Sequence, residues 1–304
     1  MTRTPRPTLQ DLIVAEARRL ARAKLVFGHG ASTLIEEAAF LAGEALGIAP
    51  DQLARRMTHK ISASAARQIA TLVTARIKTR RPAPYITKSA YIQGVRFYVD
   101  ERVLTPRSFI GELLTAEHII GSAAFVPHPA RVRRVLDLCT GSGCLAILAA
   151  KVFPNAKIDA ADISADALEV ATINVKRHRL GKRITLYHGD LFEPLPHRAY
   201  DLILCNPPYV SPASMRRLPV EYRREPALAL AGGGPDGLDI VARILAETPH
   251  RLAPKGALLC EIGAGRKALE SRYPRTPFLW LDTAESSGEV FWLTATDFRA
   301  NLRL

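Results

Sequence analysis

The first quarter of the chain carries apolar residues at helical spacing. They recur every three or four positions from Leu9 to about Arg80, and glycine-containing breaks fall at residues 28–30 and 47–51. This pattern predicts a small helical bundle. Residues 81–84, with two prolines, end the bundle as a linker.

The next residues alternate loosely between apolar and polar side chains. We predict a short hairpin over residues 91–103, with Gly94 in its turn. The segment after it predicts the start of a helix, because Pro106 suits the first helical position and Thr105 suits the cap before it.

From Val135 onward, short apolar runs alternate with amphipathic stretches. The predicted strands cover residues 135–138, 157–161, 184–188, 201–205, 257–262, 278–282 and 290–294. The predicted helices cover residues 143–152, 165–179, 238–252 and 265–272. This alternation indicates an α/β fold with a mostly parallel sheet, in which only the last two strands are close enough to form an antiparallel hairpin.

These patterns predict three parts. Residues 1–85 form a helical N-terminal domain, residues 86–105 form a hairpin linker, and residues 106–304 form the α/β domain. A chain of 304 residues is long enough for one large and one smaller core.

Composition changes this picture little. Apolar residues make up 48% and charged residues 23%, as in ordinary globular proteins. There is no apolar run of membrane-spanning length, and the first ten residues lack a signal-peptide core, so we expect a cytoplasmic protein that does not bind membranes. The four cysteines have no metal-site spacing, which predicts reduced thiols and no metal.

The positive charge is concentrated near the start of the chain. The net charge is +13, and residues 1–85 hold 14 Lys and Arg against 6 Asp and Glu, or +8. A basic N-terminal domain suits a phosphate-rich or carboxylate-rich partner, such as RNA or a ribonucleoprotein. A solvated basic helix surface without a partner fits the composition equally well.

The most informative stretch follows the fourth predicted strand. Residues 202–205 are a short apolar run that two prolines stop, which is typical of a strand buried on both faces of a parallel sheet. Asn206-Pro207-Pro208-Tyr209 therefore lies at the carboxyl end of a strand, where open α/β sheets bind their ligands.

These residue types suit the capture of a planar NH2 group. One proton is directed to the Asn206 side-chain oxygen and the other to the Pro207 carbonyl, while the Tyr209 ring stacks on the plane. A carboxamide or adenine nitrogen is a poor nucleophile, so acceptors that strengthen as positive charge develops stabilise the transition state. The structural alternative is a proline-stiffened turn after a core strand.

A second motif predicts a strand, a glycine turn and the start of a helix at residues 135–146. Gly141 and Gly143 let a ligand lie against the backbone, and the N–H groups that open the helix suit an anionic group. Asp162 ends the next strand, 21 residues after Gly141, and is placed to accept both hydroxyls of a ribose. This loop alone fits a nicotinamide dehydrogenase and an S-adenosylmethionine-dependent methyltransferase equally well.

Two downstream motifs favour the methyltransferase. Asp190, Leu191 and Phe192 follow the third strand, where an acidic side chain and a ring are placed to hold an adenine. The alternative for Asp190 is a turn residue. The motif Asn206-Pro207-Pro208-Tyr209, hereafter NPPY, has no role in hydride transfer.

Residues 137–143, Asp162, residues 189–190 and NPPY together resemble the class I S-adenosylmethionine-dependent methyltransferases. More narrowly, nearly the whole chain resembles the protein glutamine methyltransferases, which modify a glutamine side-chain amide. The resemblance implies a helical N-terminal domain, a hairpin linker and a Rossmann-like domain with a seven-stranded, mostly parallel sheet. It also implies S-adenosylmethionine as cofactor, S-adenosylhomocysteine as product, and no metal.

Two features resemble the branch that acts on ribosomal protein three of the large subunit. Residues 106–113 are similar to that branch and lack the PR-x-D-T-E pattern of the release-factor branch. Cys139 stands where the release-factor branch has glycine. Phe109 departs from the family, in which we expect proline at this position.

The long connection over residues 211–237 also resembles the family and lacks clear periodicity. Because long loops are usually functional, we expect it to bind substrate, and the alternative is a mobile surface loop. The predicted cofactor-binding residues are Asp137, Thr140, Gly141, Gly143, Asp162, Asp190, Leu191, Phe192 and Asn206. The predicted catalytic residues are Asn206, Pro207 and Tyr209, and the predicted substrate-binding residues are Asn206, Pro207, Pro208, Tyr209 and Glu225.

The leading hypothesis is methyl transfer to a glutamine of that ribosomal protein, either free or within an assembling particle, with RNA close to the basic domain. One alternative is a release-factor glutamine methyltransferase. Another is a nucleic-acid adenine methyltransferase, which NPPY also suits but for which the chain has no recognisable base-reading domain. A third is a basic ribosome-assembly protein whose methyltransferase fold has lost its activity.

Overall fold

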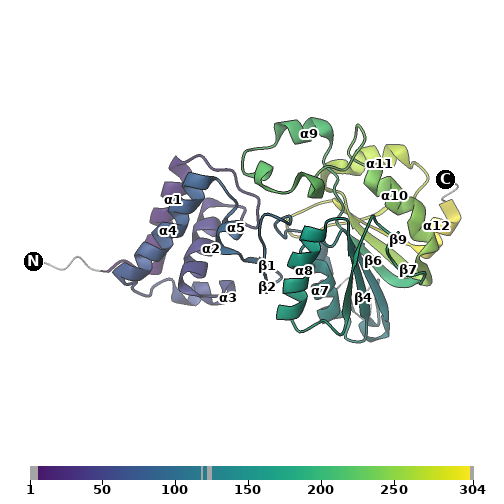
Figure 1. The fold of residues 1–304 in the computed structure, drawn as a ribbon, viewed down its shortest axis with the longest axis horizontal. Coiled ribbons are helices and arrows are strands. Elements are labelled where there is room, and N and C mark those ends of the chain that lie inside the picture. The colour runs from purple at the N-terminus through teal and green to yellow at the C-terminus, as the bar shows by residue number, and fades with distance from the viewer. Residues whose placement is uncertain (1–5, 118, 122–124, 302–304) are drawn as a thin grey trace, which may run out of the picture. The chain divides into compact units, whose positions relative to one another are not determined.

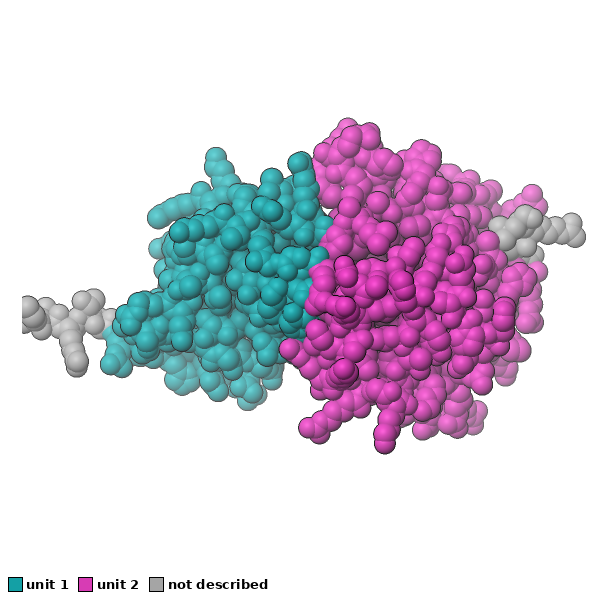
Figure 2. Space-filling view, viewed as in Figure 1, with its two compact units in different colours: residues 1–101, 219–225 teal, residues 102–218, 226–304 magenta. Residues whose placement is uncertain are grey.

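The computed structural model describes residues 6–117, 119–121 and 125–301. The ends of the predicted first and last domains, residues 1–5 and 302–304, lie outside the described residues. Contacts divide the chain into two compact units, coloured separately in Figure 2. One contains residues 1–101 and 219–225, and the other contains residues 102–218 and 226–304. Because compactness does not define what a segment does, the predicted domain functions remain proposals.

The first unit is the helical bundle that the sequence predicts. Its helices are α1 (Leu9–Arg22), α2 (Leu34–Leu46), α3 (Pro50–Leu53), α4 (Ala63–Thr79) and α5 (Ala83–Thr87), with a 3₁₀ turn, η1, at Ala54–Arg56. Thr8 and Thr33 form capping boxes with Asp11 and Glu36 and so fix the starts of α1 and α2. The apolar faces of α1, α2 and α4 meet in a core that includes Leu9, Leu41 and Ile69.

A short hairpin completes this unit. Strands β1 (Ala90–Ile92) and β2 (Val95–Phe97) are antiparallel, and Ile92 pairs with Val95. Gln93 and Gly94 both have positive φ, 49° and 70°, which is the conformation of a two-residue hairpin turn. The predicted turn at Gly94 is confirmed, but the hairpin covers residues 90–97 and not 91–103.

The second unit is built on a seven-stranded sheet (Figure 1). Its strands are β3 (Arg134–Leu138), β4 (Lys157–Asp162), β5 (Ile184–His188), β6 (Tyr200–Cys205), β7 (Leu252–Glu261), β8 (Leu279–Leu281) and β9 (Val290–Thr294). They lie in the order β5-β4-β3-β6-β7-β9-β8, and only β9 is antiparallel to its neighbours. The predicted α/β fold, with a mostly parallel sheet that ends in an antiparallel hairpin, is confirmed.

Helices pack against both faces of this sheet. The larger ones are α7 (Cys144–Val152), α8 (Ala165–Arg177), α10 (Asp239–Glu247), α11 (Arg266–Arg272) and α12 (Ala295–Asn301). Leu136 and Leu138 share a core cluster with α10, whereas Asp137, between them in β3, bonds to the start of α7. Neighbouring residues of β3 thus face opposite helical layers.

The remaining elements are short: α6 (Ile110–Leu113), α9 (Pro212–Arg217), and the 3₁₀ turns η2 (Pro129–Arg131), η3 (Tyr222–Arg224), η4 (Ala227–Ala229), η5 (Thr248–His250) and η6 (Gly263–Gly265). None of the helices in the described part of the chain is long and apolar enough to cross a membrane.

The helix predicted to open at Thr105 and Pro106 is wrong. Helix α6 begins only at Ile110, and the residues before it are a loop. The Ser108 hydroxyl and the Phe109 N–H both donate to the Glu261 carboxylate, which holds this stretch against the end of β7. A tertiary contact therefore overrides the local preference for a proline-started helix.

Candidate active site

The strand order brings the predicted motifs to one edge of the sheet. From β3 the chain continues to β4 on one side, whereas β6 pairs with β3 on the other, so the strand order reverses between β3 and β6. Leu138 is in register with Cys205, and the glycine loop and NPPY therefore begin side by side. A cavity of about 190 Å³ lies at this edge, lined by both segments and by the loops that follow β4 and β5.

Asp137 shapes the glycine loop through hydrogen bonds. Its side chain is fully buried, and Oδ2 accepts hydrogen bonds from the Thr140 hydroxyl at 2.5 Å and the Ala146 N–H at 2.9 Å. Burial raises the pKa of this carboxyl to about 7. Thr140 and Gly141 line the cavity, whereas Asp137 and Gly143 do not. Asp137 therefore acts on the cavity through the loop conformation.

Asp162 faces the same loop from the end of β4. It lines the cavity, and its two oxygens accept from the Gly141 N–H at 2.8 Å and the Ser164 N–H at 2.9 Å. Burial raises the pKa of Asp162, and these backbone donors oppose that shift. A Cβ added at Gly141 would meet no atom within 4 Å, so the space over this backbone is open for a ligand.

The loop after β5 supplies only part of the predicted set. Asp190 and Leu191 line the cavity, and Asp190 pairs with Arg243 of α10 at 2.8 Å. Phe192 points into the hydrophobic core, where 1% of its surface is exposed, and it does not line the cavity. The sequence did not predict Arg243, because its pairing with Asp190 depends on where α10 packs.

The NPPY motif follows β6 directly, as predicted. Asn206 and Pro208 line the cavity. Pro207, the residue between them, is buried and does not line it. Tyr209 does not line the cavity, and its ring packs so closely on Gly263 that a Cβ there would come within 2.6 Å of a ring carbon. Asn206 thus shares one cavity with Asp162 and Gly141, the two residues predicted to hold a cofactor.

The glycine-rich end of the long connection surrounds the backbone of Tyr209. A Cβ at Gly232 would lie 2.7 Å from the Tyr209 Cα, and one at Gly237 would lie 2.5 Å from the Tyr209 carbonyl oxygen. Val210 also pairs with Ala231 in an isolated parallel bridge. These close approaches explain the glycines at positions 232 and 237, because larger residues there would displace Tyr209.

Sequence reasoning missed Glu261, the last residue of β7. Only 2% of its surface is exposed, and burial raises its pKa to about 7. Oε2 accepts from the Ser108 hydroxyl at 2.7 Å and the Phe109 N–H at 2.9 Å, and Oε1 accepts from the Tyr209 hydroxyl at 3.4 Å. The available signal was a charged residue ending the apolar run of β7, beside β6.

Glu225, predicted to bind substrate, does not line the cavity. It belongs to the first compact unit, where its carboxylate lies 3.7 Å from the His29 ring and is 0% exposed. Its predicted role stays a prediction. Pro226, Leu228 and Ala229, which follow it directly, do line the cavity.

Comparison with known proteins gives close relatives over nearly the whole chain. The methyltransferase small domain family model matches residues 117–221. The ribosomal protein uL3 glutamine methyltransferase of Bradyrhizobium diazoefficiens is 51% identical, covering 95% of this chain and 91% of that protein. The protein of the same name from Bordetella pertussis is 49% identical, covering 94% of this chain and 95% of its own length.

A solved structure shows the same fold. The crystal structure of a methyltransferase from Pyrococcus furiosus covers 73% of this chain and 97% of its own, with a TM-score of 0.50 and 17% sequence identity. At this identity the likeness concerns the architecture alone, a class I methyltransferase fold.

Proposed function

Because the chain belongs to the family of ribosomal protein uL3 glutamine methyltransferases, we propose that it transfers a methyl group from S-adenosylmethionine to a glutamine side-chain amide of uL3. The observation that carries this proposal is that Asp162 and Asn206 line one cavity. A residue suited to a ribose and a residue suited to an amide NH2 thus lie within reach of one ligand pair.

The cavity residues fit the proposed cofactor. Asp162 offers carboxylate oxygens to the ribose hydroxyls, Asp190 offers an acceptor to the adenine amino group, and Gly141 leaves space for the chain between them. Bound there, S-adenosylmethionine supplies an electrophilic methyl group and leaves as S-adenosylhomocysteine. The described residues contain no cluster of three or more His, Cys, Asp or Glu side chains arranged for a metal ion, and the proposal invokes none.

The NPPY residues orient the amide. The Asn206 side-chain oxygen and the Pro207 carbonyl each accept one amide proton, which turns the nitrogen lone pair towards the methyl donor. Both acceptors bind more strongly as positive charge develops on nitrogen, and so they stabilise the transition state more than the ground state. Tyr209, held by Gly263 and Glu261, backs this arrangement. No general base is needed, because the alkylated amide nitrogen is strongly acidic.

We assign recognition of the protein substrate to the helical first unit. Residues 1–85 carry +8 of the net +13 charge, which suits uL3 presented on RNA in an assembling ribosomal particle. This assignment places the reaction in the cytoplasm. A partner that contains both protein and RNA offers a larger surface than the glutamine alone, which a separate recognition domain can bind.

The test is methyl incorporation with labelled S-adenosylmethionine. We expect labelling of uL3 from cells that lack this enzyme, at a single glutamine found by mass spectrometry, and no labelling with the Asn206→Ala variant. Parallel reactions contain a release factor, RNA alone, and uL3 assembled on ribosomal RNA. Labelling of RNA or of the release factor in place of uL3 would overturn the proposal.

A further inference from the structure

The connection between β6 and α10 contains a segment that belongs to the helical unit. Residues 219–225 group with residues 1–101, although the chain on either side of them belongs to the sheet-containing unit. The base of this excursion is closed, because the Val210 N–H donates to the Leu230 carbonyl at 2.7 Å and the Gly232 N–H donates back to Val210. The excursion thus starts and ends beside Tyr209.

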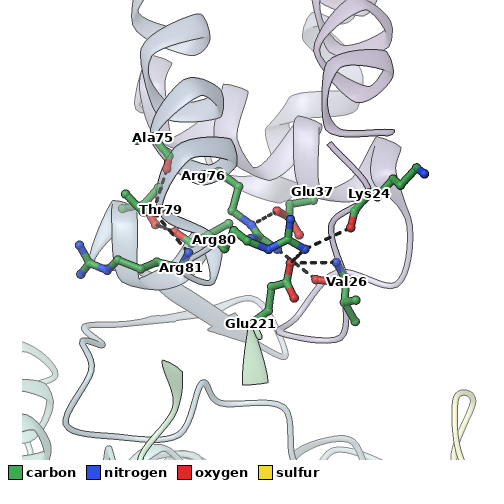
Figure 3. Close-up of polar contacts among 11 residues, drawn as sticks. Lys24, Val26, Glu37, Ala75, Arg76, Thr79, Arg80, Arg81 and Glu221 are labelled. Carbon is green, nitrogen blue, oxygen red and sulfur yellow. Dashed lines mark hydrogen bonds and ion pairs between the residues drawn. The ribbon is translucent and has the colours of Figure 1, made fainter. Parts of the chain in front are cut away.

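Glu221 is the buried centre of this segment (Figure 3). Its side chain is 1% exposed, and Oε1 accepts from Arg80 Nη2 at 2.5 Å and from the Val26 N–H at 3.2 Å. The other oxygen, Oε2, is buried without a hydrogen-bond partner among the described residues. A carboxylate in this position is stable only while Arg80 stays beside it.

Arg76 extends the same charged cluster into the bundle core. It is fully buried, donates to Glu37 at 2.5 Å, and donates through Nη2 to the Val26 carbonyl at 3.0 Å. Val26 therefore receives Arg76 on its carbonyl and presents its N–H to Glu221. The Glu221 site is part of the folded helical unit and does not depend on one exposed ion pair.

Aromatic contacts hold the segment at a second point. The Tyr222 hydroxyl donates to the Phe27 carbonyl at 3.2 Å, and its ring lies 4.3 Å from the His29 ring. A Cβ at Gly28 would lie 2.0 Å from the Tyr222 hydroxyl oxygen, so residue 28 accommodates Tyr222 only as glycine. From the sequence, Gly28 was predicted only to break a helix, and in the structure it has φ +116°.

We infer that Glu221 is a positioning residue for methyl transfer, because it ties the Pro226–Ala229 wall of the cavity to the helical unit. Pro226, Leu228 and Ala229 line the cavity and follow the buried Glu225 without an intervening linker. Substrate binding to the helical unit thereby bears on the cavity wall through this segment. The inference rests on the proposed function for its effect on rate.

Glu221→Gln keeps the size of the side chain and removes the charge that Arg80 needs. Loss of a buried charged pair corresponds to roughly a tenfold or larger shift in a local opening equilibrium. We expect amide exchange at residues 229–231, which are hydrogen-bonded within and just after η4, to accelerate about tenfold. The single-turnover methylation rate of uL3 should fall by a similar factor, with the Kd for S-adenosylmethionine changed less than about twofold.

Glu16→Gln is the matched control. Glu16 pairs with Arg19 within α1, at 2.6 Å. It destabilises the bundle without releasing the segment, so amide exchange at residues 229–231 should match wild type. Arg80→Met should reproduce Glu221→Gln, and the double variant should be no worse than either single one.

Exchange is measured on the full chain without substrate, so it tests the tether whether or not uL3 is the substrate. Unchanged exchange at residues 229–231 in Glu221→Gln, with faster exchange confined to 219–225, would overturn the inference. Equally accelerated exchange at residues 229–231 in Glu16→Gln would do the same. Failure of the wild-type protein to methylate uL3 contradicts the proposed function, and the exchange result then decides the tether alone.

Discussion

The Tyr209 hydroxyl and the Glu261 carboxylate are hydrogen-bonded across neighbouring strand ends, with 3.4 Å between the two oxygens. Tyr209 closes the NPPY motif after β6, and Glu261 is the last residue of β7. The same carboxylate holds Ser108 and Phe109, so one side chain supports two walls of the cavity. The charge of Glu261 therefore affects the geometry around Asn206.

The first prediction concerns the pH dependence of the rate. Burial and, less strongly, the charge of Glu289 raise the pKa of Glu261 to about 7, although hydrogen bonds from Ser108, Phe109 and Tyr209 favour the ionised form. Ionised Glu261 accepts all three hydrogen bonds, and protonation removes one acceptor position. Single-turnover rates should fall as pH drops below about 7, and Glu261→Gln should lack this decline. If the rate of Glu261→Gln falls at low pH as the wild-type rate does, the titration of another group causes the decline.

The same pKa makes a prediction about stability, with a defined sign. A carboxyl whose folded pKa is raised holds a proton that the unfolded chain has already released, so the free energy of unfolding falls as pH rises from about 4.5 to about 7. One such group contributes at most about 1.4 kcal/mol per pH unit within this window. Denaturant titrations should show a smaller decline for Glu261→Gln. Part of the remainder is due to other buried carboxyls with a raised pKa, among them Asp137, at about 7, and Asp162.

A further prediction concerns Gly263, which packs against Tyr209. A Cβ there would lie 2.6 Å from a Tyr209 ring carbon, and the residue has φ +52°, so Gly263→Ala must displace the ring. We expect the methylation rate to fall on the order of tenfold, because misplacing a positioning group by about 1 Å has large effects on rate. Gly181→Ala is the control, since a Cβ there meets nothing within 4 Å. Equal methylation rates for the two variants would show that the position of the Tyr209 ring does not affect the reaction.

Asp162→Ala tests the cofactor assignment. A carboxylate that accepts two ribose hydroxyls should contribute roughly 2–3 kcal/mol to binding, since charged hydrogen bonds contribute about 1.5–3 each before non-additivity. Asp162 also accepts from the Gly141 N–H, so Asp162→Asn, which keeps a carbonyl acceptor, separates loop support from ribose binding. Calorimetry with S-adenosylmethionine measures both, and wild-type affinity in the Ala variant would refute the ribose assignment.

Asn206→Ala tests the NPPY chemistry. Removing the acceptor and the positioning it provides should lower the single-turnover rate about 10²–10³-fold, since such groups are worth about 2.7–4 kcal/mol in transition-state stabilisation. Cofactor binding should change far less. Asn206→Asp keeps an acceptor but places a charge beside the sulfonium already in the ground state, so it should bind cofactor well and react slowly. A single-turnover rate of Asn206→Ala within about threefold of wild type would show that NPPY is only a structural turn.

The sequence by itself determined the approximate positions of the sheet strands and the local motifs. Strands β5 and β9 have the predicted bounds, and the turn at Gly94 lies where the glycine placed it. These features depend on side-chain periodicity and backbone preference, which act over a few residues. The position of Asn206 at a strand end follows from the same local rules, because two prolines stop β6.

Only the tertiary structure decided which residues meet. Thr105 and Pro106 do not start a helix, because Ser108 and Phe109 bond to Glu261, more than 150 residues away in the chain. Phe192 lies in the core and Glu225 in the helical unit, although both stand in motifs that predicted ligand contact. Residue type sets which chemistry a side chain offers. Whether it faces a cavity depends on the packing of elements distant in sequence, which periodicity does not encode.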